Sequence, residues 1–208
     1  VFVSADKIRL ARRGAFLAEG ENFNGATGII MAQENKFLKA FRLVVDKMKL
    51  NDNQKITEIS ICGEIFGGDY PQLQSTVAMV QKGVFYSNER HFFAFDIRII
   101  ADYNGEISNK YLDWDEVVEI LDDCQIFRAQ ELGRMTAGEV VKELLEHNTI
   151  RKYPPEFPTT IPLRLGHPPL DKNFAEGYVI KPIHDVFSRG GSRMILKYKN
   201  PKFSEMQK

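Results

Sequence analysis

The sequence is poor in the residues and runs that mark several common classes of protein. Its two cysteines, Cys62 and Cys124, are too few for a disulfide framework or a cysteine-based zinc site. No apolar run approaches the ~20 residues that span a bilayer, and the four histidines show no metal-ligand spacing. Neither charge is in excess, since 28 Lys and Arg residues balance 28 Asp and Glu residues. These features exclude a membrane helix, a histone-like basic protein and an acidic disordered tail, and they favour a reducing compartment.

What is present predicts an α+β fold. A chain of 208 residues buries roughly 70% of the surface that its unfolded form exposes, so it folds without disulfides or metal. Strand and helix patterns follow one another without regular βαβ alternation, which argues against a doubly wound sheet. The predicted strands are 1–4, 7–11, 56–66, 91–100, 176–181 and 193–199, and the first predicted helix is 35–49.

Two further helices are predicted from capping boxes, in which a capping residue is followed three positions later by Glu. These boxes are Asp113 with Glu116, and Thr136 with Glu139. The apolar residues expected to face the core from these helices are Val117, Val118, Ile120 and Leu121 in the first, and Val140, Val141, Leu144 and Leu145 in the second.

Glycine, asparagine and proline predict the connections. Residues 14–28 contain four glycines that fit no phosphate-loop or dinucleotide-binding spacing, so they are interpreted as turns. The strand 56–66 is expected to end at Gly67-Gly68, and Asn104-Gly105 is typical of a tight hairpin turn. Residues 153–169 hold six of the nine prolines and are predicted to be a loop or linker.

The strongest chemical signal is basic. From Lys181 to Lys208 there are seven Lys or Arg residues against two acids. Because side chains alternate along a strand, Lys197 and Lys199 project from one face, where two ammonium groups ~7 Å apart could hold a phosphate. The alternative for this face is plain exposure to solvent.

Two acidic residues open or interrupt predicted strands. Glu64 lies inside an apolar stretch and Glu176 stands before a glycine at the start of a strand. A buried acid needs a partner or a cation, so both are candidates for contacts with a metal or with ribose hydroxyls; Glu64 could equally face solvent at a strand end.

Aromatic residues in 91–97 (His-Phe-Phe-Ala-Phe-Asp-Ile) permit two interpretations. Phe92, Phe93 and Phe95 could all be core residues, or one of them could stack on a nucleobase. Cys62 is interpreted as a strand thiol and not as a nucleophile, because no histidine pattern accompanies it.

Taken in order, these segments resemble the covalent nucleotidyltransferases, and within them the RNA ligase 2 family of phage and kinetoplastid RNA-editing ligases. Motif III resembles residues 62–68 (Cys-Gly-Glu-Ile-Phe-Gly-Gly), and motif IIIa resembles 91–97. Motifs IV and V resemble 176–181 (Glu-Gly-Tyr-Val-Ile-Lys) and 195–200 (Ile-Leu-Lys-Tyr-Lys-Asn). Arg12-Arg13 with 21–25, similar to motif Ia, and the tail 201–205 point to the RNA ligase branch.

One motif of the family is absent from residues 1–208. Its nucleophilic lysine stands in Lys-x-x-Gly, and no lysine here is followed by glycine three positions later. Val1–Ser4 resembles the strand that follows this motif, so the lysine is expected before Val1. A C-terminal RNA-positioning domain is likewise expected outside 1–208, which would then be one adenylyltransferase domain.

The resemblance implies two antiparallel sheets beside a nucleotide cleft and an ATP-dependent ligase that joins RNA 3′-OH and 5′-phosphate ends with Mg²⁺ or Mn²⁺. The implied partner is RNA with nicked or broken ends, and the implied process is RNA repair or editing. No membrane partner is implied. The resemblance also implies a role for each candidate residue. Glu64 would contact the ribose, Phe95 and Val179 would contact adenine, and Lys197 and Lys199 would contact phosphate. Glu176 would bind metal or orient the nucleophile, and Arg13 would contact phosphate or the RNA terminus.

Three other functions stay open on sequence grounds. A ligase-like domain without catalysis would only bind nucleotide or RNA. A DNA ligase or an mRNA-capping relative would share the strand motifs of the superfamily.

Overall fold

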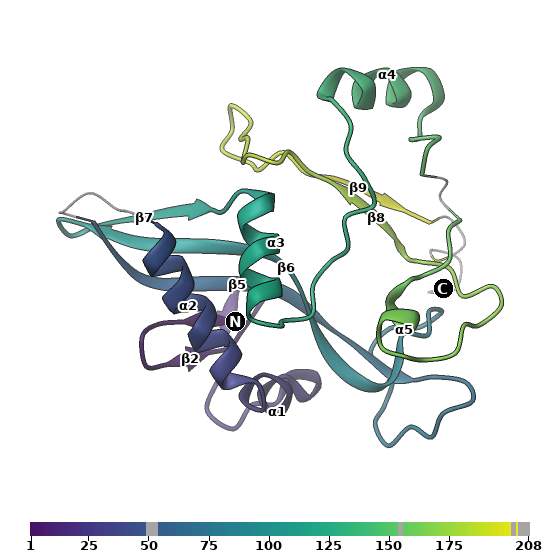
Figure 1. Cartoon of the computed structure of the whole chain (residues 1–208), viewed down its shortest axis with the longest axis horizontal. Helices are drawn as coiled ribbons and strands as arrows, with labels where there is room; N and C mark the ends of the chain where they lie inside the picture. The colour runs from purple at the N-terminus through teal and green to yellow at the C-terminus, as the bar shows by residue number, and fades with distance from the viewer. Residues whose placement is uncertain (49–53, 154–155, 201–202, 204–208) are drawn as a thin grey trace. The chain divides into compact units, whose positions relative to one another are not determined.

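The computed structural model describes residues 1–48, 54–153, 156–200 and 203, and mixes helices with antiparallel strand pairs (Figure 1). The predicted α+β class is therefore confirmed. The chain forms two compact units, each assembled from separate segments. The first unit comprises the described residues of 1–65, 90–129 and 182–194; the second comprises 66–89, the described residues of 130–181 and those from 195 onward.

A five-stranded sheet runs through the first unit in the order β2-β1-β5-β6-β7. β1 pairs antiparallel with both β2 and β5, and β6 pairs antiparallel with β7. β5 and β6 are long, so each of them has residues in both units. The bounds are β1 Phe2–Val3, β2 Ile8–Arg9, β5 Gln54–Asp69, β6 Ser87–Tyr103 and β7 Glu106–Tyr111.

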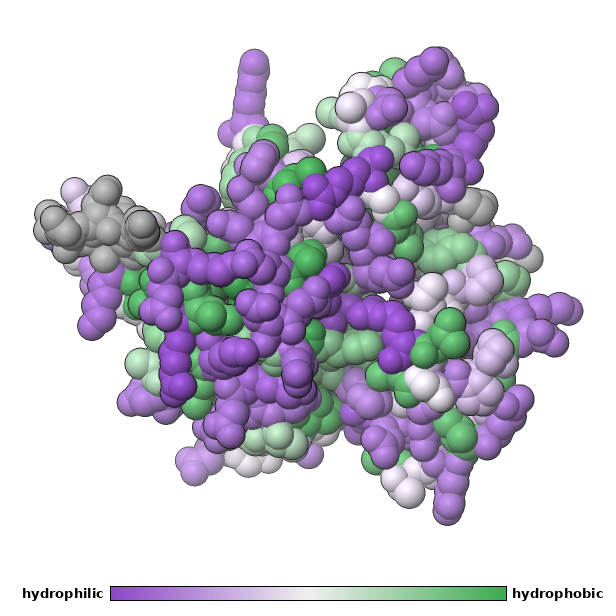
Figure 2. All heavy atoms as spheres, viewed as in Figure 1, coloured by the Kyte–Doolittle hydropathy of each residue, from purple (hydrophilic) through white to green (hydrophobic). Residues whose placement is uncertain are grey.

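Two amphipathic helices, α2 (Glu34–Lys47) and α3 (Trp114–Asp123), pack their apolar sides against this sheet. Phe37 of α2 and Ile120 of α3 are buried in one core with Ile59 of β5. Hydrophilic side chains cover much of the outward face over these helices (Figure 2). The predicted helix 35–49 is thus confirmed for its described part, and burying one face against the sheet is what stabilises it.

The N-terminal region is more regular than predicted. The expected strand 7–11 is two strands, because β2 joins the five-stranded sheet whereas β3 (Ala11–Arg12) forms a separate hairpin with β4 (Ala15–Phe16). The stretch 14–28 is not turns alone, since it also contains the 3-10 helix η1 (Phe23–Gly25) and the start of α1 (Ala26–Met31). A short helix of this kind gives little periodic signal, and burial of Ile30 holds it in place.

The expected end of β5 at its two glycines is wrong. The strand continues through Gly67 and Gly68, whose φ angles are +91° and +106°. A Cβ at Gly67 would meet the carbonyl oxygen of Glu89 at 2.1 Å, and one at Gly68 would meet that of Ala78 at 2.3 Å. Here glycine permits the close approach of neighbouring backbone and does not stop the strand.

Local signals elsewhere were reliable. Asn104 and Gly105 have φ angles of 50° and 89°, as a type I′ turn requires, and they join β6 to β7. Both capping boxes form, with Asp113 before α3 and Thr136 before α4 (Ala137–His147).

The second unit also holds α4, the short α5 (Ile161–Arg164) and the strand pair β8 (Gly177–Ile180) and β9 (Leu196–Lys199). The core contacts expected of α4 are wrong, since none of its residues is buried and Leu145 is 82% exposed. The described residues of 153–169 are irregular except for α5, where Pro162 occupies the first turn and therefore costs no helical hydrogen bond. No described helix has the length and hydropathy to cross a membrane.

Candidate functional site

The pair β8–β9 brings three predicted site residues together. Val179 lies opposite Lys197, and Lys199 lies opposite Gly177, in antiparallel register. Directly opposed residues share a face of a sheet, so one face presents Val179 and both lysines. All three side chains are exposed. The predicted alternation, with Lys197 and Lys199 on the same side, is confirmed by this register.

The opposite face of this pair is aromatic. Tyr178 and Tyr198 are cross-strand partners whose rings stack at 5.1 Å between centroids with an interplanar angle of 10°. Tyr153 and Phe157 pack around Tyr178 at 6.4 and 6.3 Å. Such ring contacts stabilise a two-stranded ribbon that would be marginal alone. They therefore fix the face that carries the lysines.

Gly177 allows the two strands to approach at the point where Lys199 is displayed. Its φ is +150°, and a Cβ there would lie 1.9 Å from the carbonyl oxygen of Tyr198. Any other residue would push the strands apart. The glycine of the Glu-Gly dipeptide is thus required by the geometry of the pair.

Glu176 precedes β8 and is tied on both its backbone and its side chain. Its carbonyl oxygen accepts a hydrogen bond from the Asn200 backbone N–H at 2.8 Å, which extends the ladder beyond β9. Its Oε1 accepts a hydrogen bond from the Tyr86 hydroxyl at 2.9 Å. Tyr86 is buried edge-on against Phe66. Glu176 is therefore a partly buried, oriented carboxylate.

Glu64 and Phe95 belong to the long strands β5 and β6 in the first unit. Ile59 and Ile61 face the core, so alternation places Glu64 on the opposite face of β5, where its side chain is exposed. Burial raises the pKa of Cys62, which is on that same face, and this keeps its thiol protonated as expected of a structural residue.

The three phenylalanines of β6 have different surroundings. Phe92 is buried in the core with its ring edge-on to Phe37 at 5.8 Å, so it is a core residue. Phe93 contacts Phe127, whereas Phe95 is only half-buried. Of the three, Phe95 and Phe93 thus keep part of their rings accessible.

β6 is irregular at Phe95 and Asp96. Ala94 and Ile97 both face the core, so strict alternation is broken between them. The Ala94 backbone pairs with 127–129, while the ladder with β7 reaches Ile97 through the Leu112 N–H. Phe95 and Asp96 thus lie where β6 passes from one neighbour to the other.

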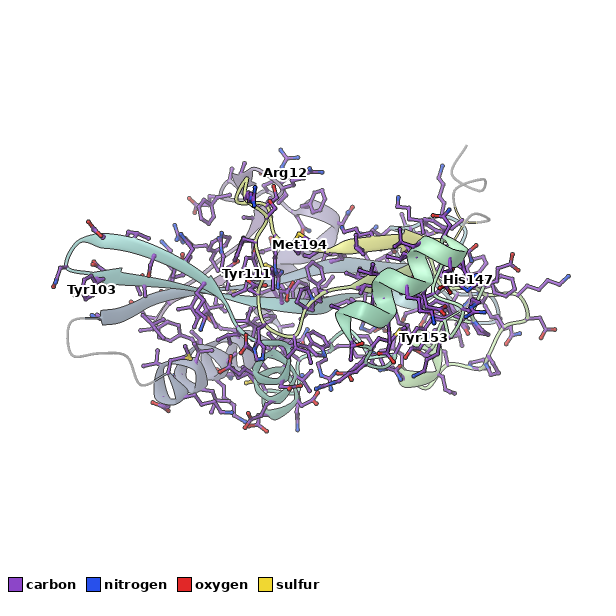
Figure 3. All side chains as sticks on the ribbon, turned by 90° about the horizontal axis from the view of Figure 1, so that it is seen from above. Arg12, Tyr103, Tyr111, His147, Tyr153 and Met194 are labelled. Carbon is purple, nitrogen blue, oxygen red and sulfur yellow. The ribbon has the colours of Figure 1, made fainter. Side chains whose placement is uncertain are left out.

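The guanidinium of Arg193 lies beside this irregularity of β6. Arg193 donates to both carboxylate oxygens of Asp96, at 2.6 and 3.2 Å, and to Oδ1 of Asp185 at 2.5 Å. Its Cζ lies 3.9 Å from the ring centroid of Tyr111, and Figure 3 shows Tyr111 near the segment that carries Met194. Burial opposes the charge, but the hydrogen bonds to Asp96 and Asp185 raise the pKa of Arg193 above its ordinary value.

This network was missed by sequence reasoning. Arg193 and Asp96 are 97 positions apart, and no local pattern connects them. The one available signal was Asp96 itself, an acid at the end of an aromatic strand that would need a partner if buried.

Arg13 occupies the turn between β3 and β4 and is exposed. Its neighbour Arg12 reaches Glu21 at 3.7 Å in an exposed ion pair. The tail 201–205, apart from Phe203, lies outside the described residues. Phe203 is buried, and its N–H donates to the carbonyl of Asn200 at 3.1 Å.

The second unit supplies one oriented carboxylate, Glu176, and two exposed lysines, Lys197 and Lys199, which are the kinds of group that contact a metal and phosphates. Mg²⁺ commonly takes one or two carboxylates together with substrate phosphates, and Glu176 supplies an oriented carboxylate near the start of the strand that carries Val179. Within the described ranges, no group of three or more His, Cys, Asp or Glu side chains could hold a metal ion.

A model of the RNA ligase family matches residues 1–199. The chain therefore belongs to the RNA ligase family. Its relatives include mitochondrial RNA-editing ligase 2 of Trypanosoma brucei brucei (strain 927/4 GUTat10.1), which is 28% identical over 223 residues. Mitochondrial RNA-editing ligase 1 of Trypanosoma brucei brucei is 28% identical over 199 residues.

These matches cover most of this chain but only part of each relative. They include 96% and 85% of this chain, against 49% of ligase 2 and 39% of ligase 1. The chain thus spans about half, or less, of the length of these relatives. The predicted resemblance to kinetoplastid RNA-editing ligases is confirmed at this level of identity.

Proposed function

We propose that residues 1–208 are the adenylyltransferase part of an ATP-dependent RNA ligase that joins 3′-OH and 5′-phosphate RNA ends. The observation that carries the proposal is the exposed face of β8–β9, which displays Val179, Lys197 and Lys199 in a chain of the RNA ligase family. An aliphatic side chain suits the flat face of a base, and two cations suit phosphate groups.

The reaction would proceed in three steps. A lysine nitrogen attacks the α-phosphorus of ATP and pyrophosphate leaves, which gives lysyl-AMP. An oxygen of the RNA 5′-phosphate then attacks that phosphorus, the lysine leaves, and AMP is joined to the RNA end. The 3′-OH of the other end finally attacks the RNA 5′-phosphorus and AMP leaves. Residues 1–208 contain no Lys-x-x-Gly sequence, so the proposal assigns the nucleophile to a lysine outside them.

Each predicted residue receives a role. Lys197 and Lys199 neutralise the phosphates, and their charges also favour the neutral, nucleophilic form of a nearby lysine. Glu176, held by Tyr86, binds the metal or orients the nucleophile.

Roles in binding the nucleoside and the RNA end are proposed for Val179 and for three residues of the first unit. The family motifs assign an adenine contact to Val179 and, separately, an adenine contact to Phe95. Glu64 contacts the ribose hydroxyls, and Arg13, exposed in its turn, contacts the phosphate or the RNA terminus.

The test uses a longer chain that includes residues 1–208 and a Lys-x-x-Gly lysine. With ATP and Mg²⁺ it should gain the mass of one AMP on that lysine, and it should seal RNA nicks better than all-DNA nicks because 2′-hydroxyls and A-form shape distinguish RNA. Labelling by GTP but not ATP would identify a capping enzyme instead. Equal sealing of all-DNA nicks would identify a DNA ligase, and an AMP on Lys7 would overturn the assignment of the nucleophile.

A second candidate function is that of a ligase-like domain that binds nucleotide or RNA without catalysis. Calorimetry with ATP and covalent labelling, both made on the longer chain, separate the two functions. Binding of ATP by the longer chain without covalent labelling would support this second function.

A further inference from the structure

The segment between β8 and β9 forms a hairpin arm, defined here as residues 186–194, in the first unit (Figure 1, yellow). Phe187 and Arg193 form an antiparallel bridge. The Met194 N–H donates to the Val186 carbonyl at 2.8 Å, and the Ser188 N–H donates to the Ser192 carbonyl at 2.8 Å. The arm is therefore a short hairpin held by one bridge and two backbone hydrogen bonds.

The tip of the arm is closed by its own hydrogen bonds. The Gly191 N–H donates to the Ser188 carbonyl at 2.9 Å, and the Ser192 N–H donates to Ser188 Oγ at 3.2 Å. Gly191 has a φ of +76°, which a glycine adopts without strain. A tip that is already ordered loses little conformational entropy when it binds a partner.

The base of the arm is held by charged and backbone contacts. Arg193 is paired with Asp96 and Asp185, and it lies on the ring of Tyr111. Just before the arm, the Ile183 carbonyl accepts a hydrogen bond from the Trp114 N–H at 3.0 Å. The arm is thus anchored to β6, to β7 and to the start of α3.

Three side chains of the arm are apolar and exposed, although its base is anchored to neighbouring elements. Phe187 is 53% exposed, more than any other phenylalanine among the described residues. Val186 and Met194 are each about half exposed. Because Phe187 pairs with Arg193 while Val186 lies beside Met194, Phe187 shares a face with Arg193, and Val186 and Met194 lie on the opposite face. The exposed ring of Phe187 is available to stack on a partner.

The charge of the arm points to an anionic partner. It contains two arginines and no acid, within a segment from Lys181 to Lys208 that has seven basic residues and two acids. Arg193 is engaged by Asp96 and Asp185, whereas Arg189 is exposed at the tip. An exposed ring two positions from an exposed guanidinium suits a partner that carries both bases and phosphates.

We propose that this arm contacts RNA, with Phe187 stacking on a base and Arg189 binding an adjacent phosphate. The inference rests on the proposed function, which supplies RNA as the substrate. The contact is sequence-tolerant, because every base has a face that can stack. The arm would thus help to position RNA ends independently of the residues assigned to ATP.

The direct test measures RNA affinity of the whole chain by fluorescence anisotropy, with a labelled nicked RNA duplex that carries 3′-OH and 5′-phosphate ends. Phe187→Ala should weaken binding by roughly fivefold to a hundredfold, the range for loss of one stacked base. Phe187→Tyr should bind nearly as the parent does. The matched control is Tyr103→Ala, which removes an exposed aromatic ring at the β6–β7 turn and should leave RNA affinity unchanged.

Salt dependence gives Arg189 a separate signature. Arg189→Ala should reduce the slope of log affinity against log salt concentration by about 0.7 to 0.9, as expected for one lost phosphate contact. Phe187→Ala should leave that slope unchanged, because stacking releases no counterion. Unaltered slopes in Arg189→Ala would exclude the phosphate contact.

Stacking itself can be observed with a tryptophan placed on the arm. Trp114 is the single tryptophan of the chain, so Phe187→Trp in a Trp114→Phe background gives one emitter. Its fluorescence should be quenched when the nicked RNA binds, and an unchanged emission on saturation would overturn the stacking contact.

The outcomes distinguish this inference from the function on which it rests. If the parent chain binds nicked RNA and Phe187→Ala binds equally well, the arm is not an RNA contact but the ligase assignment stands. If the parent chain does not bind RNA at all, the proposed substrate is wrong and the inference falls with it. Loss of self-association in Phe187→Ala, with RNA affinity intact, would show a protein contact instead.

Discussion

Val179 and Lys197 lie directly opposite each other in the β8–β9 pair, so an exposed aliphatic side chain and an ammonium group share one face. Lys199 adds a second cation on the same face. The residue opposite Lys199 is Gly177, which has no side chain to cover the lysine. On the other face, stacked Tyr178 and Tyr198 hold the two strands together.

Replacement of either lysine should abolish most of the adenylylation while leaving the fold intact. Lys197→Ala and Lys199→Ala should each slow lysyl-AMP formation by ~10²–10³-fold, the effect of removing a fixed group aimed at developing charge. Both side chains are exposed, so thermal stability should not change. Labelling of the longer chain with α-labelled ATP measures the rate, with Lys110→Ala on β7 as the control. Normal labelling by both variants would mean that the lysine face is merely solvated.

The two phenylalanines Phe92 and Phe95 should respond differently to truncation. Phe95→Ala should weaken ATP binding by about 1–3 kcal/mol if the ring stacks on adenine. Phe92→Ala should leave intrinsic ATP affinity alone and lower stability by about 3–5 kcal/mol, because its ring is buried against Phe37. Calorimetric titration with ATP and urea unfolding of both variants give the comparison. A Phe95→Ala protein with unchanged affinity and a large loss of stability would make Phe95 a core residue.

Features set by neighbouring residues were predicted well from the sequence. The turn at Asn104-Gly105, the capping boxes at Asp113 and Thr136, and the alternation of Lys197 and Lys199 all depend on dihedral preferences or periods within a few positions. Their physical cause is local, so a single sequence contains it.

Features set by distant contacts were not predicted. The apolar positions of α4 have a helical period, but none of the residues of this helix is buried and Leu145 is 82% exposed. Gly67 and Gly68 act through the backbone near Glu89 and Ala78, which no local rule reveals. The candidate site was recognised residue by residue from the family motifs, whereas the pairing of Arg193 with Asp96 required the fold.

The end of α4 should loosen in acid. Hydrogen bonds from the side chain and backbone of Arg151 lower the pKa of Glu143 from 4.5 to about 2. Because the folded pKa is below the unfolded one, this contribution to stability is complete above about pH 4.5 and is lost as the pH falls toward about 2. Hydrogen exchange of the α4 amides at pH 5 and pH 3 should show the change. Glu143→Gln should reduce this pH dependence to the part that comes from Glu139, whose pKa is lowered by its hydrogen bonds with Thr136, whereas Glu146→Gln should leave the pH dependence whole.

Removal of the Arg193 guanidinium should destabilise the first unit more than the loss of any exposed ion pair. Asp96 and Asp185 are almost fully buried, so Arg193→Ala leaves two carboxylates without their cation, at a cost of about 3–5 kcal/mol in urea unfolding. Arg193→Lys keeps the charge but lacks the planar fork that reaches Asp96 and Asp185 together, so its loss should be intermediate. The control is Arg9→Ala, which removes the more exposed pair with Glu58 and should cost about 0–1 kcal/mol. Equal stability of Arg193→Ala and Arg9→Ala would show that the network of Arg193 with Asp96 and Asp185 contributes no more to the free energy of unfolding than a surface ion pair. It would also show that the arm between β8 and β9 does not depend on this network.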